Sequence, residues 1–203
     1  MTASDERTVS RAERQARTRE LLITTARHLF LADGYGATSL DRVAVEAGFS
    51  KGAVYSNFKS KEELCLAVLD SIHDQQIEEV VAVFSDGATI DDRLDAFSQW
   101  ARERLGQPRW TALEVEFASS ARHSPFVASE LAKRHASLRA GIATLIRAVL
   151  KDAELEVSMT PEQAATALLS LGIGLGAQRS LDPEVDVDVF AVTMRQLMGL
   201  PPK

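Results

Sequence analysis

The most diagnostic part of this chain is the segment TSLDRVAVEAGFSKGAVYSNFKSK, which occupies positions 38–61. In its first half, apolar residues recur at the i, i+3, i+4, i+7 spacing of one helix face: Leu40, Val43, Ala44 and Ala47. Gly48 follows directly, where the left-handed conformation that ends many helices favours glycine. The segment therefore predicts two short helices joined by a tight turn, the geometry that places the second helix in the major groove of DNA.

Side chains with hydroxyl groups stand at the expected helix starts. Thr38 is placed to cap the first helix, and Asp41 three residues later fits the acidic position of a capping box. Ser50 is placed to cap the second helix. Ser60 together with Glu63 predicts a further capping box at the start of the helix that follows.

The second helix has one inward and one outward side. Val54 and Phe58 at i, i+4 predict its buried anchors. The outer set is small, polar or basic, which lets a helix approach base edges, and it consists of Lys51, Gly52, Ala53, Tyr55, Ser56 and Asn57. Lys61 lies in the first turn of the next helix, where a nearby phosphate would relieve its conflict with the helix dipole. Each residue alone also fits an ordinary solvated surface, so the prediction depends on the whole segment.

This segment resembles the DNA-binding domain of the TetR family of bacterial transcriptional regulators. The matching residues keep an unbroken order and spacing and cover about a quarter of the chain: Ala26, Leu29, Phe30, Gly34, Tyr35, Thr38, Ser39, Leu40, Val43, Ala44, Ala47, Gly48, Ser50, Lys51, Gly52, Tyr55, Phe58, Lys61 and Leu64. The resemblance implies a three-helix head, a long linking fourth helix, a helical ligand-binding body and a homodimer.

The resemblance also implies roles for single residues. Positions 51–57 would form the recognition helix, and Thr38 and Lys61 would hold phosphates. Ser39 and Ser50 belong to the same candidate DNA-binding set. The family often has threonine where this chain has Ala53, so one hydroxyl contact is absent.

Charge is unevenly distributed along the 203 residues, whose formal net charge is -6. Residues 1–61 hold ten Lys or Arg and seven Asp or Glu, a balance of +3, whereas residues 62–203 hold thirteen and twenty-two, a balance of -9. A basic head on an acidic body suits a protein that docks one end on a polyanion. Four arginines, Arg11, Arg14, Arg17 and Arg19, could follow a DNA backbone or enter a narrow minor groove, or could simply be a solvated helix start.

Composition also bears on the compartment. The single cysteine, Cys65, excludes an internal disulfide, fits a reducing cytoplasm, and lies on an apolar helix face. The N-terminus lacks an apolar signal region, and no apolar run approaches the roughly 20 residues of a membrane span. We therefore expect a cytoplasmic protein without a membrane partner.

Helical periodicity continues to the end of the chain, with no alternating β pattern, and predicts an all-α fold of about nine helices. The expected domains are an N-terminal arm with a helix-turn-helix head, 1–61, and a helical ligand-binding and dimerisation body, 62–203. Gly87 is expected to end the long fourth helix, and Pro108 to separate the two helices that follow. Later helices are expected to start at 124–125, 160–163 and 182–184, and the last to end near Gly199.

Two of these helices are candidates for a dimer interface. Residues 164–181 are apolar around most of the helix circumference, which requires burial on all sides. Gly172, Gly174 and Gly176 would each weaken a lone helix by about 1 kcal/mol, and close helix–helix approach would offset that cost. We expect 164–181 and 184–199 to pair with their symmetry copies in a four-helix interface.

A helical body joined to a DNA-binding head suggests a small-molecule effector that shifts the population between two head spacings. The candidate ligand-binding residues are Phe97, Trp100, Arg104, Trp110, Glu114, Phe117, His135 and Gln178, with Phe126 as a further aromatic. Any one of these aromatics is more often a core residue than part of a pocket. The four histidines and Cys65 have no metal-ligand spacing, and no cofactor motif is present.

The sequence thus favours a ligand-responsive, homodimeric DNA-binding regulator, most often a repressor, released from a palindromic operator by a small molecule. A DNA-binding regulator without a small-molecule effector, controlled by a protein partner or acting as an activator, is the alternative. A helical enzyme is a remote third hypothesis, because no catalytic constellation or phosphate loop can be named. Glu114 and Glu116, at i, i+2, fall on different helix faces.

Overall fold

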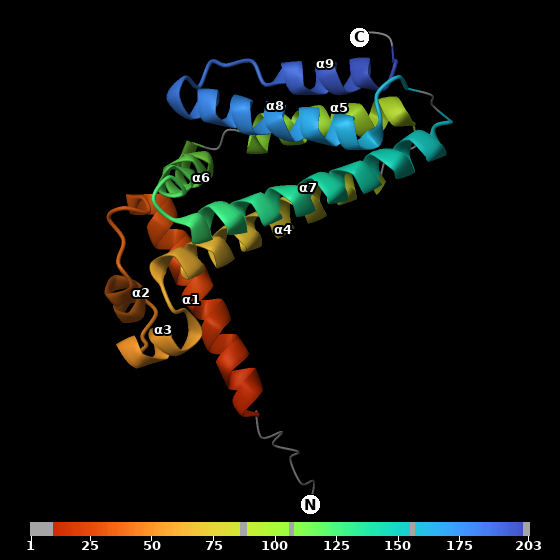
Figure 1. Ribbon diagram of the computed structural model, residues 1–203. Helices are drawn as coiled ribbons and strands as arrows, with labels where there is room; N and C mark the ends of the chain where they lie inside the picture. The colour runs from red at the N-terminus through yellow and green to blue at the C-terminus, as the bar shows by residue number, and fades with distance from the viewer. Residues whose placement is uncertain (1–9, 86–88, 106–107, 155–156, 201–203) are drawn as a thin grey trace, which may run out of the picture. The chain divides into compact units, whose positions relative to one another are not determined.

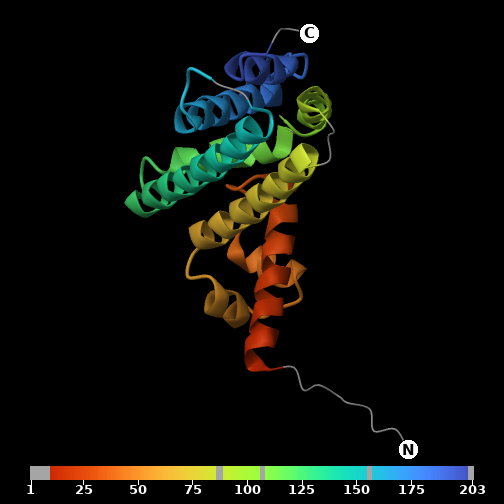
Figure 2. The same cartoon turned by 90° about the vertical axis from the view of Figure 1, so that its right-hand side faces the viewer.

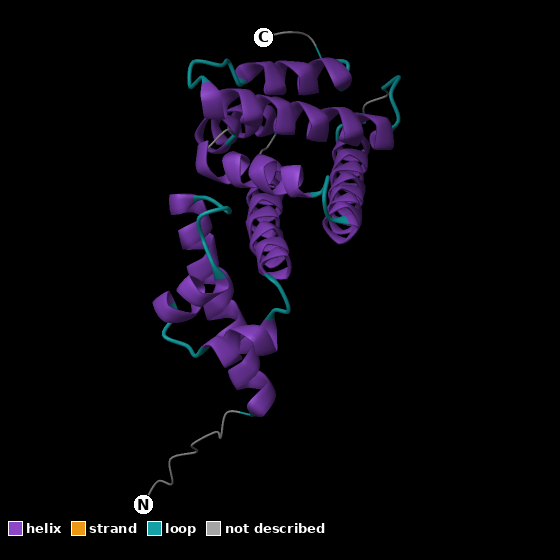
Figure 3. Cartoon of the chain, turned by 60° about the vertical axis from the view of Figure 1, so that its left-hand side comes forward, coloured by secondary structure: helices purple, strands orange, loops and turns teal. Residues whose placement is uncertain are grey.

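The computed structural model describes residues 10–85, 89–105, 108–154 and 157–200. Within these ranges the chain forms nine α-helices and no strand (Figure 3), which confirms the predicted all-α fold. None of the described helices is long and apolar enough to span a bilayer. The chain divides into two compact units, Met1–Val68 and Leu69–Lys203, so the first turns of the fourth helix belong to the N-terminal unit.

The N-terminal unit, here called the head, is built on a long first helix. Its three helices are α1 (Arg11–Asp33), α2 (Leu40–Glu46) and α3 (Lys51–Asn57). The two short helices pack against α1 and against each other (Figures 1 and 2). Apolar side chains at helical spacing meet in the head core, and all of these are buried: Leu22, Ala26, Leu29, Phe30, Val43, Ala44, Val54 and Phe58. The predicted inward anchors of α3 and the apolar face of α2 at Val43 and Ala44 are therefore confirmed.

The cap of α2 corrects one expectation. Ser39, and not Thr38, is the N-cap, and its hydroxyl accepts from the backbone N–H of Arg42 at 3.2 Å. Thr38 is only 1% exposed, and its hydroxyl donates inside the head to the carbonyls of Gly34 at 3.0 Å and Leu29 at 3.5 Å. Thr38 and Ser39 both carry a hydroxyl that could cap the helix. Thr38 is buried in the head core, so Ser39 forms the cap.

The turn between α2 and α3 follows the sequence pattern. Gly48 has φ +72°, a left-handed conformation that non-glycine residues rarely adopt. The N–H of Phe49 donates back to the carbonyl of Ala44 at 2.9 Å, as expected for a glycine-terminated helix. The Ser50 hydroxyl accepts from the N–H of Ala53 at 3.2 Å and caps α3, as predicted. Local hydrogen bonds thus set the angle at which α3 leaves the turn.

The C-terminal unit, here called the body, starts within the long helix α4. Its helices are α4 (Lys61–Ser85), α5 (Ile90–Arg104), α6 (Pro108–Ser120), α7 (Pro125–Asp152), α8 (Pro161–Leu181) and α9 (Asp188–Leu197). Helix α8 packs against α6, α7 and α9, and α5 lies along α9 (Figure 1). The expected break at Gly87 lies outside the described residues. Pro108 begins α6 and does not merely precede it.

Several predicted body boundaries are confirmed and two expectations are wrong. Thr160 and Gln163 form a reciprocal capping box at the start of α8. The last helix starts at Asp188 and not at 182–184, because the chain first makes a turn in which Val185 N–H donates to the carbonyl of Asp182. Phe126, the further aromatic candidate for ligand binding, lies in the first turn of α7, is 52% exposed and does not line the body cavity described below.

The glycines of α8 differ in their surroundings. A Cβ at Gly176 would lie 3.0 Å from Oγ1 of Thr111, so α6 and α8 approach closely there. At Gly172 the nearest atom, in the Phe190 ring, would be 3.6 Å away, an ordinary contact. Gly174 has nothing within 4 Å. Close approach inside the chain therefore accounts for one of the three glycines.

Candidate nucleic-acid interface and body cavity

Helix α3 presents a thin outward side within the head. Lys51, Gly52 and Ser56 are exposed, and Tyr55 is 54% exposed, while Ala53 and Asn57 are half-buried. Val54 and Phe58 are fully buried and hold the helix from the other side. The small side chains leave the backbone accessible, so a helix with this face can lie against base edges.

The polar groups of α3 make contacts that a ligand can replace. Lys51 Nζ lies 2.5 Å from Oδ2 of Asp41, and this hydrogen-bonded ion pair raises the pKa of the Lys51 ammonium. Both side chains are largely exposed, so the pair contributes little to stability and is open to exchange with a phosphate. The Asn57 amide donates to the Ala53 carbonyl at 2.8 Å, which orients it along the helix.

Arg19 has a structural role that the sequence left open. Its guanidinium carbon lies 4.2 Å from the centre of the Phe58 ring, and Nη1 donates to the carbonyl of Asn57 at 2.9 Å. A cation at the C-terminal carbonyls of α3 also interacts favourably with the helix dipole. Arg19 therefore fixes the end of α3 to α1. Arg11, Arg14 and Arg17 lie on the exposed start of α1.

Lys61 and Thr38 were both expected to hold phosphates. Lys61 Nζ lies 4.1 Å from the centre of the Tyr35 ring and donates to the carbonyl of Gly36 at 3.3 Å. It thus ties the start of α4 to the turn after α1, and its half-buried side chain remains accessible. The buried Thr38 hydroxyl is engaged within the head and is not available to DNA, so that part of the interpretation is corrected; Ser39 lies beside it at the start of α2.

A separate apolar cavity of about 230 Å³ lies in the body, between α4, α5, α6, α7, α8 and α9. Five of the candidate ligand-binding residues line it: Phe97, Trp100, Arg104, Trp110 and Glu114. Phe97 stacks on the Phe190 ring, with ring centres 5.3 Å apart, and Trp100 lies 5.4 Å from Phe97. Phe97 and Trp100 therefore belong both to the hydrophobic core and to the cavity wall.

The other candidates lie elsewhere. Phe117 is fully buried and is not among the lining residues. Gln178 is exposed and donates to the carbonyl of Gly174 at 3.4 Å. His135 does not line the cavity, but its Nε2 lies 3.6 Å from Oε1 of Glu114.

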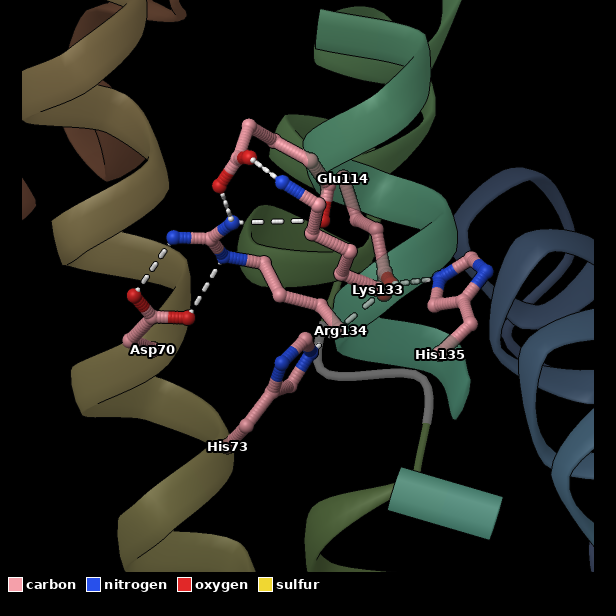
Figure 4. Close-up of polar contacts among 7 residues, drawn as sticks. Asp70, His73, Glu114, Lys133, Arg134 and His135 are labelled. Carbon is pink, nitrogen blue, oxygen red and sulfur yellow. Dashed lines mark hydrogen bonds and ion pairs between the residues drawn. The ribbon is translucent and has the colours of Figure 1, made fainter. Parts of the chain in front are cut away.

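Glu114 joins two imidazoles at the edge of the cavity, and we call Glu114, His73 and His135 the carboxylate–imidazole cluster. Figure 4 shows the carboxylate of α6 between His73 of α4 and His135 of α7, with Nε2 atoms 3.7 and 3.6 Å from Oε1. Glu114 is 8% exposed. Burial alone would raise the pKa of Glu114, but its close contacts with the two imidazoles outweigh burial and lower this pKa to about 2. The carboxylate is therefore charged.

Arg134 lies next to this cluster but belongs to a different network. It forms a bidentate pair with Asp70, at 2.7 and 2.8 Å, and donates to Glu130 at 2.9 Å (Figure 4). The pair joins α7 to α4. Because Arg134 is already paired with two carboxylates, Glu114 depends on imidazoles for its counter-charge. In the described part of the chain, no group of three or more His, Cys, Asp or Glu side chains has the geometry to hold a metal ion.

Sequence reasoning missed His73 and most aliphatic lining residues, including Ile77, Leu145 and Met194. His73 is far from Glu114 in the sequence, so their contact cannot be recognised from the sequence. The i, i+4 spacing of α4 residues His73 and Ile77 was the available signal, since both lie on the cavity side.

The geometry of the head, with a capped second helix after a glycine turn and a free outer face, defines a helix-turn-helix DNA-binding protein. Two family models match the chain: "Bacterial regulatory proteins, tetR family" over residues 22–68, and "BetI-type transcriptional repressor, C-terminal" over residues 90–198. The chain belongs to the TetR family and is a transcriptional regulator of that family.

Individual proteins similar to this chain are also transcriptional regulators. The HTH-type transcriptional regulator UidR of Escherichia coli K12 is 25% identical over 186 residues, covering 90% of this chain and 91% of UidR. The HTH-type regulator TtgR of Pseudomonas putida is 39% identical over 67 residues, 32% of each chain.

Solved structures share the fold at low identity. The reduced form of Escherichia coli NemR superposes with a TM-score of 0.72 at 21% identity, over 91% of this chain and all of that one. A transcriptional regulator from Saccharomonospora viridis in complex with choline gives a TM-score of 0.66 at 20% identity, over 91% of this chain and 96% of that one.

Proposed function

We propose that this protein is a homodimeric repressor that binds a palindromic operator and leaves it when a small molecule enters the body cavity. The observation that carries the proposal is the combination of a thin, exposed α3 face in the head with an apolar cavity in the body. The α3 face would bind DNA, and a ligand in the body cavity would control that binding.

The candidate operator-binding residues are those that α3 and its neighbours leave accessible: Ser39, Ser50, Lys51, Gly52, Ala53, Tyr55, Ser56, Asn57 and Lys61. Lys51 and Lys61 are the cations of this set, and their ammonium groups would neutralise phosphates. Tyr55 is its one aromatic side chain, and its ring would contact a sugar, a phosphate or a thymine methyl group.

Homodimerisation through 164–181 and 184–199 is supported by apolar side chains that remain on the surface of α8 and α9. Leu181, Val189 and Val192 are exposed. Gly174 has open space where a Cβ would lie, so a second helix could approach the α8 backbone there. A twofold dimer would present two copies of α3 to inverted half-sites.

An effector in the cavity is supported by its wall, which is mostly aliphatic and aromatic with few polar groups, as in small-molecule sites generally. The choline complex of the Saccharomonospora viridis regulator adds that a protein of this fold holds a small molecule. The effector would favour the head spacing that fits DNA poorly and so lower the operator-bound population.

The test is selection of bound duplexes from a random pool, followed by gel shift with the selected duplex. We expect an inverted repeat, and a steep loss of affinity between about 50 and 200 mM salt, because several phosphates release counterions. A compound screen then seeks release of the duplex. An asymmetric single half-site or a flat salt response contradicts the proposal, and operator binding that no compound or metabolite extract releases favours a regulator without a small-molecule effector.

A further inference from the structure

We propose that the body cavity selects an organic monocation with a small apolar or aromatic part, that Glu114 is the residue that selects its charge, and that protonation of His73 and His135 competes with binding. This inference rests on the proposed function only in taking the cavity as the effector site. It names the chemical class of the effector and the group that recognises it.

The first argument is the charge balance of the cavity wall. Among the described lining residues, the side chains with a permanent formal charge are Arg104 and Glu114. Arg104 Nη2 already lies 3.2 Å from Oε1 of Glu79, which also accepts from Trp100 Nε1 through Oε2 at 3.0 Å. Glu114 has no Lys or Arg partner in the described part of the chain. The cavity wall therefore carries one negative charge without a permanent counter-charge.

The second argument is the environment of that charge. A buried carboxylate is stabilised only by close opposite charge or by several hydrogen bonds. The contacts of Glu114 to the two imidazoles, at 3.6 and 3.7 Å, are longer than the roughly 2.7–3.2 Å of direct hydrogen bonds. Nε2 of His135 is buried and makes no hydrogen bond. The carboxylate is thus incompletely satisfied, and a cation in the cavity would complete its surroundings.

The third argument is the shape and chemistry of the remaining wall. A cavity of about 150 Å³ holds one benzene ring, so about 230 Å³ leaves room for a ring and a small head group. Trp100 and Trp110 line the same cavity as Glu114. Indole faces attract cations, most strongly where water is excluded. A compact organic cation therefore fits both the charge and the walls.

The imidazoles make this binding dependent on pH. Each is charged only when protonated, and each then supplies the positive charge that Glu114 lacks. The other charged groups nearby are already paired: Asp70 and Glu130 with Arg134, and Arg104 with Glu79. Arg179 of α8 donates to the carbonyls of Arg102 and Leu105. A bound cation and protonated imidazoles would repel each other, so cation affinity should rise with pH.

The experiment uses three probes of nearly equal size with the full chain and without DNA. Benzyltrimethylammonium is the cation, neopentylbenzene is its neutral isostere with carbon in place of nitrogen, and 3-phenylpropanoate is the anion. The two tryptophans of the chain, Trp100 and Trp110, both line the cavity, so their fluorescence reports occupancy directly. We expect the cation to bind at least about tenfold more tightly than the isostere, a difference of about 1.4 kcal/mol. Equal affinity, preference for the anion, or no saturable signal with the cation overturns the proposal.

The matched variants are Glu114→Gln and Glu116→Gln, which remove the same charge from the buried and from an exposed position of α6. We expect Glu114→Gln to reduce cation affinity to that of the isostere, while Glu116→Gln leaves it unchanged. If Glu114→Gln does not fold, the probe series with the natural sequence still decides. As the pH is lowered, cation affinity should fall while that of the isostere stays constant. A flat profile for the cation contradicts the role given to the imidazoles.

These outcomes are separate from those of the proposed function. If neutral compounds bind and release the operator as well as the cation does, the protein is still a ligand-responsive repressor and the charge assignment fails. If the cation binds through Glu114 but no duplex is bound, the charge assignment holds and the repressor proposal fails.

Discussion

Replacing Gly176 by alanine tests the close contact between α6 and α8. A Cβ at this position would lie 3.0 Å from Oγ1 and 3.3 Å from Cγ2 of Thr111, closer than ordinary van der Waals contact. Thr111 is 1% exposed, and a β-branched side chain has few alternative rotamers in a helix. The neighbour therefore cannot move away freely.

The expected magnitude is the balance of two terms. Alanine gains about 1 kcal/mol over glycine in helix propensity. Overpacking of a filled site costs roughly 1–3 kcal/mol, so Gly176→Ala should destabilise the protein by about 1 kcal/mol. Gly141→Ala is the matched control, because Gly141 lies within α7 with nothing within 4 Å of a Cβ, and it should stabilise by about 1 kcal/mol.

The assay is urea unfolding followed by far-UV circular dichroism at one fixed protein concentration. The two variants should differ by about 2 kcal/mol. In a Thr111→Ala background the obstructing side chain is gone, so Gly176→Ala should become stabilising, with a coupling energy of at least about 1 kcal/mol. If Gly176→Ala is as stabilising as Gly141→Ala, the inferred approach of α6 and α8 is refuted.

Three further predictions concern the interface, the dimer and the buried carboxylate. Tyr55→Ala should weaken operator binding about tenfold in a gel shift with stability unchanged, and Tyr55→Phe separates the ring from the hydroxyl; unchanged affinity of the alanine variant counts against α3 as the groove helix. Gly174→Ala should raise the dimer dissociation constant in sedimentation equilibrium, and an unaltered constant argues against α8 pairing there. Glu114 has a lowered pKa in the folded protein, about 2 against an ordinary 4.5, so its contribution is present above pH 4.5 and is lost as pH falls toward 2. Urea unfolding at a series of pH values measures this contribution, and Glu114→Gln should remove on the order of 2–3 kcal/mol of the acid-dependent stability. If the variant and the natural sequence have the same dependence of stability on pH, the carboxylate is not stabilised in this way.

The elements that the sequence predicted well are those whose structure depends on neighbouring residues. Ser50 caps α3 and Thr160 caps α8 through contacts three residues away, and Gly48 ends α2 because its backbone needs a positive φ. The buried anchors Val54 and Phe58 follow from helical spacing alone. The head was therefore predicted almost completely.

The expectations that the structure corrects concern residues whose burial is decided by tertiary packing. Thr38 and Ser39 have nearly the same capping ability, and only packing in the head buries the first. Phe126 fits an apolar helix face, yet no described part of the chain covers it fully. The late start of α9 is similar, because a turn and a helix start both suit the residues at 182–184.

For the candidate sites, the α3 face was predictable by residue because it lies on one short helix. Five of the eight proposed ligand-binding residues do line the cavity, but their aromatic and charged character alone did not separate them from Phe117 and Gln178. The cluster of Glu114 with His73 and His135 was not predictable, since it joins three helices that are distant in sequence. Short-range hydrogen bonds and periodicity act between neighbours and can be recognised from one sequence, whereas a buried charge acquires its partners only when the packed helices bring them within a few ångströms.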